Sequence, residues 1–110
     1  MHNVEKFLKY LQFEKRYSLH TITSYSTDLS QFQQFLSKEY KVNNVNDIHH
    51  KLIRSWISVI LESGLSARSV NRKITTLKSF FRYLVLEGVL EENPTNKIVS
   101  PKNKPIIIIY

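Results

Sequence analysis

Apolar residues recur at helical spacing in several stretches of this 110-residue chain. The first stretch, from Val4 to about Tyr17, predicts an amphipathic helix with a narrow apolar stripe. The second begins after Ser18, a residue type that favours the N-cap position, and runs to about Lys38. The residues expected to face the core from these two helices are Val4, Phe7, Leu8, Leu11, Ile22, Tyr25, Leu29, Phe32 and Leu36.

Two further helices follow a turn-rich segment at residues 40–47, whose Val42 and Val45 should pack under the fold. The third runs from about His50 to Ser63, and Gly64 can end it in a left-handed conformation. Ser66 should cap the fourth and longest helix, which is expected to stop at Gly88. The predicted inward residues are Leu52, Ile53, Trp56, Ile57, Ile60 and Leu61 in the third helix, and Val70, Ile74, Leu77, Phe81 and Leu84 in the fourth.

The chain after the fourth helix has the composition of irregular structure. The sequence "NPTNK" at residues 93–97 breaks the chain again, because the residue before a proline avoids helical backbone. From residue 100 onward, "SPKNKPIIIIY" reads as an extended linker or exit strand. The pattern therefore predicts an all-α domain at residues 1–99 and a linker at residues 100–110.

Composition narrows the class of protein further. The chain is long enough for one domain with a modest core, and its hydrophobic content of 42% argues for a folded globule. It has no cysteine, which excludes disulfides and thiolate metal sites and fits a reducing cytoplasm. Charged residues interrupt the N-terminal segment, so it has no signal-peptide core, and the longest apolar run, residues 106–109, is too short to span a membrane. We therefore expect a cytoplasmic protein without a membrane partner.

The net charge of +7 favours a polyanionic partner. No acidic residue lies between Glu62 and Glu87, the segment that contains the whole fourth helix. Exposed helical faces usually mix charge signs, whereas this one is rich in arginine, whose fork matches phosphates and guanine edges. At about 100° per residue, the face directed away from the core comprises Arg68, Asn71, Arg72, Thr75, Ser79 and Arg82, with Lys78 at its margin.

The outer face of the second helix is polar and uncharged. It carries Thr23, Thr27, Ser30, Gln31 and Gln34. Hydroxyl and amide groups beside an arginine face suit a surface on which some groups grip phosphate and others read base edges. Such a face also suits a polar protein interface.

Other chemistry finds less support in the residue spacing. His49 and His50 are adjacent and do not share a helix face as an i, i+4 metal-binding pair would, so we expect them at a helix start and predict no metal site. A tyrosine that attacks phosphate needs converging arginines and a proton donor. Tyr10, Tyr25 and Tyr83 are better explained as packing residues. The chain alone is therefore expected to have no catalytic site, and we expect it to need no cofactor.

Two blocks of residues stand out together along the chain. The first block comprises Ser18, Thr21, Tyr25, Asp28, Leu29, Phe32, Phe35 and Leu36. The second comprises residues 64–69, Arg72, Leu77, Phe81, Leu84, Glu87, Gly88, Asn93 and Pro94. In order and separation, these blocks resemble the N-terminal core-binding domain of tyrosine recombinases of the phage-integrase family, in particular the Xer-type members. Ala67 stands where proline is frequent in the family.

The resemblance implies a compact four-helix SAM-like bundle that forms one half of a C-shaped clamp around a DNA half-site. Its second and fourth helices would face the major groove, and the residues at groove-facing positions would be Thr23, Ser24, Thr27, Arg68 and Arg72. A basic linker that includes Lys102 would pass along the DNA. It would lead to a catalytic domain that breaks strands through a phosphotyrosyl intermediate, without a metal or nucleotide cofactor.

The implied partners are double-stranded DNA, the catalytic domain of the same full-length protein and other recombinase protomers. On this interpretation the chain alone should not cut or rejoin DNA. The alternative is a stand-alone helical adaptor or regulator whose basic face binds RNA or an acidic protein. An open reading frame that continues into a second domain would favour the recombinase.

Overall fold

The computed structural model describes residues 2–99, which form an all-α domain as predicted. No strand occurs among these residues. The elements are α1 (His2–Phe13), α2 (Leu19–Tyr40), the short 3-10 helix η1 (Val45–Asp47), α3 (His50–Glu62), α4 (Ala67–Leu86) and the 3-10 helix η2 (Pro94–Lys97). The predicted linker, residues 100–110, lies outside the described residues and stays a prediction, as does the role given to Lys102.

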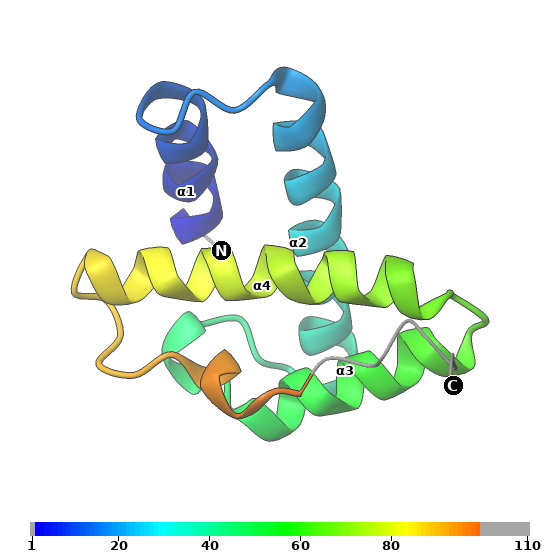
Figure 1. Ribbon diagram of the computed structural model, residues 1–110. Helices are drawn as coiled ribbons and strands as arrows, with labels where there is room; N and C mark the ends of the chain where they lie inside the picture. The colour runs from blue at the N-terminus through cyan, green and yellow to red at the C-terminus, as the bar shows by residue number, and fades with distance from the viewer. Residues whose placement is uncertain (1, 100–110) are drawn as a thin grey trace.

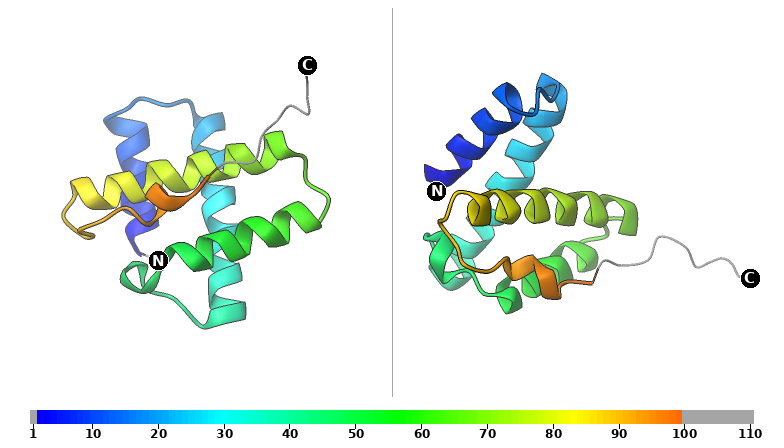
Figure 2. Two further views of the ribbon diagram at one scale, coloured as in Figure 1. Left: turned by 60° about the horizontal axis from the view of Figure 1, so that its bottom comes forward. Right: turned by 60° about the vertical axis from the view of Figure 1, so that its left-hand side comes forward.

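The four α-helices form two antiparallel pairs that cross one another. Helix α1 and the first part of α2 stand side by side on one side of α4; α2 then passes behind α4, and α3 runs antiparallel to α4 on the other side (Figure 1). Figure 2 shows α2 crossing both α4 and α3 at a steep angle. Helix α4 contacts α1, α2, α3 and η2, so it is the central element of the bundle.

The core lies along α4 and combines aromatic and aliphatic side chains. The rings of Phe7 and Phe80 approach to 5.4 Å between centroids, and those of Phe32 and Trp56 to 5.1 Å. The predicted stripes of α2 and α4 supply many of the buried positions, and Val45 is buried as expected. Helix α4 also buries Phe80 and Tyr83, which its predicted stripe omitted. Its buried arc is wide because other elements pack on both of its sides.

Leu61 was predicted to face the core, and that prediction is wrong: 38% of its surface is exposed. The buried residues of α3 are Ile53, Trp56, Ile57 and Ile60. At about 100° per residue, Leu61 lies beyond the edge of this stripe. A helix that is covered on one side leaves such a margin in solvent.

Helices α2 and α4 begin at the expected caps, whereas α1 ends earlier than predicted and α2 continues two residues further, to Tyr40. The Oγ atoms of Ser18 and Ser66 accept hydrogen bonds from the N–H groups of Thr21 and Ser69, each at 3.2 Å. Helix α1 ends at Phe13, earlier than predicted, because Arg16 adopts a left-handed conformation with φ 56°. The N–H of Tyr17 then donates to the carbonyl of Leu11 at 3.0 Å and closes the helix end.

Gly64 and Gly88 follow α3 and α4 with φ values of 100° and 76°, as their predicted roles require. Each allows the chain to reverse directly after a helix. Within residues 2–99, none of the helices has both the length and the apolar character needed to cross a bilayer.

A candidate nucleic-acid interface on α2 and α4

Helices α2 and α4 cross and contact each other (Figure 1). Their packing leaves most of the predicted binding residues accessible to solvent. Exposed members are Thr23, Thr27, Arg68, Arg72, Thr75 and Arg82, and partly exposed members are Ser24, Asn71 and Lys78. The predicted binding residues of α2 and α4 are thus at least partly accessible. We call the α4 cations Arg68, Arg72, Lys78 and Arg82 the basic face.

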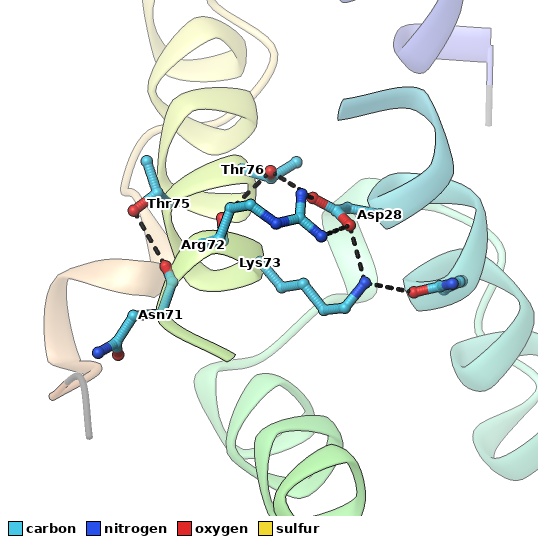
Figure 3. A network of polar contacts seen from close by, with 7 residues as sticks. Asp28, Asn71, Arg72, Lys73, Thr75 and Thr76 are labelled. Atoms are coloured by element: carbon cyan, nitrogen blue, oxygen red, sulfur yellow. Dashed lines mark hydrogen bonds and ion pairs between the residues drawn. The ribbon is translucent and has the colours of Figure 1, made fainter. Parts of the chain in front are cut away.

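A buried carboxylate from α2 lies beneath the basic face. The Asp28 side chain is 1% exposed, and its Oδ2 and Oδ1 accept from Arg72 Nη1 at 2.8 Å and Nη2 at 3.2 Å (Figure 3). Lys73 Nζ donates to Oδ1 at 2.8 Å, and the Thr76 hydroxyl donates to Oδ2 at 2.8 Å. Helix α4 therefore has a counter-charge, although its own sequence contains no acidic residue.

Lys73, like Thr76, is a residue of this network that the sequence interpretation missed. Its side chain is 8% exposed, and its ammonium also donates to Gln31 Oε1 at 2.7 Å. Gln31 was assigned to an outer polar face, and it is exposed while its amide oxygen serves this contact. The lysine thus joins α2 to α4 inside the domain. It is not part of the accessible charge.

The other cations of α4 differ from Arg72 and Lys73, which are paired with Asp28. Arg68 and Arg82 are exposed, Lys78 is partly exposed, and none of the three forms an ion pair within residues 2–99. Figure 3 shows Thr75 and Asn71 on the opposite side of α4 from Asp28. The outward face of α4 is thereby divided into a side tied to α2 and a side turned towards the segment that contains η2.

That second side carries a hollow of about 210 Å³ between α4 and the chain around η2. Lys78 and Arg82 line it, and none of its described lining residues carries a carboxylate. The other described lining residues are Asn93, Thr95, Asn96 and Ile98. Asn93 Oδ1 accepts from the N–H of Thr95 at 2.9 Å and from its hydroxyl at 2.6 Å, which fixes this part of the loop. The side chains of Lys78 and Arg82, next to the polar groups of Asn93 and Thr95, form a site suited to bind an anionic oxygen such as that of a phosphate.

Comparison with known proteins identifies the architecture. Residues 4–88 match the family model described as phage integrase, N-terminal SAM-like domain. The chain belongs to this family. It is 39% identical to the tyrosine recombinase XerC of Oceanobacillus iheyensis over 94% of this chain and 34% of that protein. It is 40% identical to the tyrosine recombinase XerD of Rickettsia prowazekii over 98% of this chain and 35% of that protein.

The XerC of Bacillus subtilis is 35% identical over 94% of this chain and 35% of the relative. The chain therefore spans about a third of the length of these relatives. No solved structure matches it. The resemblance seen in the sequence is confirmed at the level of the family and of the recombinases that contain this domain.

The adjacent histidines His49 and His50 lie at the start of α3, as predicted. His49 Nδ1 accepts from the N–H of Lys51 at 3.4 Å, and the rings of His49 and His50 are 4.2 Å apart. Desolvation, reinforced by the positive charges of His49 and Arg54, lowers the pKa of His50. Within residues 2–99, no group of three His, Cys, Asp or Glu side chains could hold a metal ion.

The tyrosines singled out in the sequence pack against the core of the SAM-like domain. Tyr83 is buried, and Tyr10 and Tyr25 are partly buried against the same cluster. Burial, followed by the influence of the Glu87 carboxylate, raises the pKa of Tyr83. A raised pKa keeps the phenol protonated, whereas an activated nucleophile has a lowered pKa or an adjacent base.

Proposed function

We propose that this SAM-like domain binds duplex DNA through the outer faces of α2 and α4, as a DNA-binding domain of a site-specific tyrosine recombinase. The observation that carries the proposal is the accessible charge of Arg68, Lys78 and Arg82 on α4. Within residues 2–99, the only carboxylate in an ion pair with this helix is Asp28, which is buried and already paired with Arg72 and Lys73. The names of the relatives support the class of enzyme.

The two sides of α4 suggest a division of labour. An α-helix fits the major groove, where arginine can pair with the O6 and N7 atoms of guanine. Arg68 and Arg72 lie near the start of α4, and Arg72 binds Asp28 of α2, the helix that also carries Thr23, Ser24 and Thr27. We assign these two arginines and the three hydroxyl residues to base edges. We assign Lys78, Arg82 and the hollow beside η2 to a backbone phosphate, with Asn71 and Thr75 between the two regions.

The domain would bind one half-site and place a catalytic domain of the same full-length protein against the DNA, next to other protomers. We assign strand breakage to that catalytic domain. The packed tyrosines and the raised pKa of Tyr83 support this division.

A trapping experiment tests the assignment of the chemistry. Incubated with a nicked suicide duplex and run on a denaturing gel, the 110-residue chain should give no covalent protein–DNA band. A band that disappears when one tyrosine is changed to phenylalanine would show that this chain carries the nucleophile itself.

The phosphate assignment gives a measurable salt dependence. Affinity for a mixed-sequence duplex should fall steeply as salt rises, because each neutralised phosphate releases counterions. Lys78→Ala and Arg82→Ala should each weaken binding on all sequences and reduce the slope of log K against log salt by about 0.9. Fluorescence anisotropy at a series of salt concentrations measures this slope.

Lys51→Ala, which removes an exposed lysine of α3, is the matched control and should leave the slope unchanged. An affinity that does not change with salt would contradict phosphate binding. Tighter binding to single-stranded RNA or to an acidic protein than to duplex DNA would instead favour the adaptor function.

A further inference from the structure

The Asp28 carboxylate pairs with two cations, Lys73 and Arg72, although only Lys73 is buried and needs a counter-charge. Lys73 is buried and needs a counter-charge, and its Nζ lies 2.8 Å from Oδ1. Arg72 is different, because 51% of its side chain is exposed and water could solvate it. It is nevertheless bound by both Nη atoms to both carboxylate oxygens. Arg72 is thus a surface residue whose side-chain orientation is fixed by the buried Asp28 carboxylate.

The geometry of this pair leaves a defined edge of the guanidinium for another acceptor. A guanidinium carries one N–H on Nε and two on each Nη. The bonds to Asp28 use one hydrogen of Nη1 and one of Nη2, which is the end of the fork. The Nε–H and an outer N–H of an Nη form the side edge, and this edge can also donate two parallel hydrogen bonds.

The position of the Asp28 carboxylate is fixed by several hydrogen bonds, so it can orient the Arg72 side chain. It accepts hydrogen bonds from Arg72, Lys73 and Thr76, and its side chain is almost completely excluded from solvent. A long arginine side chain normally loses rotamer freedom when it binds, and a support that fixes it beforehand removes part of that loss. Arg68 has no such carboxylate within the described residues.

We propose that Asp28 is a positioning residue for DNA recognition: it grips the end of the Arg72 fork and presents the side edge of Arg72 to a base in the major groove. This inference rests on the proposed function and adds to it a residue that does not touch DNA. Asp28 would therefore control sequence discrimination without contributing to overall affinity.

Because Asp28 is negatively charged, a variant without this charge can distinguish a role in positioning Arg72 from a role in stabilising the fold. Asp28→Asn keeps the size of the side chain and removes a negative charge near the DNA, so affinity for random duplex should be unchanged or slightly higher. The preference for a selected duplex over random duplex should fall by at least about fivefold, the lower end of what one bidentate base contact is worth. A structural defect would instead lower both affinities together.

The experiment first selects preferred duplexes from a randomised pool with the 110-residue chain and then measures affinity for selected and scrambled duplexes. The variants are Asp28→Asn, Arg72→Ala and the double variant. In the double variant, Asp28→Asn should cause no further loss of discrimination beyond that of Arg72→Ala, because its effect passes through Arg72. Independent, additive losses would overturn the proposal.

Two further variants keep the test decisive if Asp28→Asn unfolds. Arg72→Lys keeps the charge but lacks the fork, so it should lose discrimination and keep its affinity for random duplex. Thr76→Val removes the hydroxyl that donates to Asp28 at 2.8 Å and lies 3.3 Å from the Arg72 carbonyl, but it leaves the bonds of the Arg72 guanidinium to Asp28 in place. It should therefore lower the urea midpoint and keep discrimination. Loss of discrimination in Thr76→Val, or its retention in Arg72→Lys, would contradict the positioning role.

The outcomes also separate this inference from the proposed function. If the chain binds no duplex DNA, the proposed function fails. If it binds duplex DNA but selection yields no preferred sequence, DNA binding stands and the positioning of Arg72 for base recognition is overturned.

Discussion

Asp28→Ala should destabilise the domain by about 3–5 kcal/mol, because it leaves a buried ammonium without its carboxylate. The Lys73 side chain is 8% exposed and would keep only its contact to Gln31. The buried hydroxyl of Thr76 would lose its acceptor as well. Since domains of this size are stable by about 5–15 kcal/mol, urea denaturation followed by circular dichroism would show a large shift of the midpoint.

The double variant Asp28→Ala/Lys73→Met is the matched control for this expectation. It removes both charges and replaces the lysine with an apolar side chain of similar length, so it should recover much of the loss. If Asp28→Ala alone stays within about 1 kcal/mol of the unmodified chain, the network is a surface ion pair and does not lock α2 to α4.

Arg68→Ala should weaken binding to a selected duplex by about 5- to 150-fold, which corresponds to the 1–3 kcal/mol of a bidentate base contact. Arg68 is exposed and forms no ion pair within residues 2–99, so its removal should leave stability nearly unchanged. Arg72→Ala should weaken binding within the same range, but it also removes a partner of Asp28. Arg68 is therefore the cleaner variant for a binding measurement by anisotropy.

Arg68→Lys separates the two contributions of this residue. A lysine preserves the charge and hence phosphate attraction, but it lacks the fork, so the preference for the selected duplex should still fall. Lys51→Ala on α3 controls for the loss of one positive charge. Equal weakening of Arg68→Ala on selected and scrambled duplexes would show that Arg68 contacts phosphate only.

The helices were predictable because their signals are local. Apolar spacing located α1 to α4, and the caps at Ser18 and Ser66 and the glycines at Gly64 and Gly88 set most of their ends. The early end of α1 was not predictable in this way, because it depends on the left-handed backbone of Arg16, a residue that rarely adopts it.

The candidate site was only partly predictable. A helical projection places Arg68, Thr75 and Arg82 on the outer face from sequence alone, and they are exposed. The same projection cannot pair Asp28 with Arg72 and Lys73, because those contacts join residues 44 and 45 positions apart. Only the crossing of α2 over α4 brings them together.

The most direct test of DNA binding by α2 and α4 is a titration of the isotopically labelled chain with duplex DNA, followed by nuclear magnetic resonance of its amide and arginine side-chain signals. We expect the largest shifts in α4 between Arg68 and Arg82 and in α2 between Thr23 and Thr27. Shifts confined to α1 and α3, or no shifts at low salt, would contradict the account.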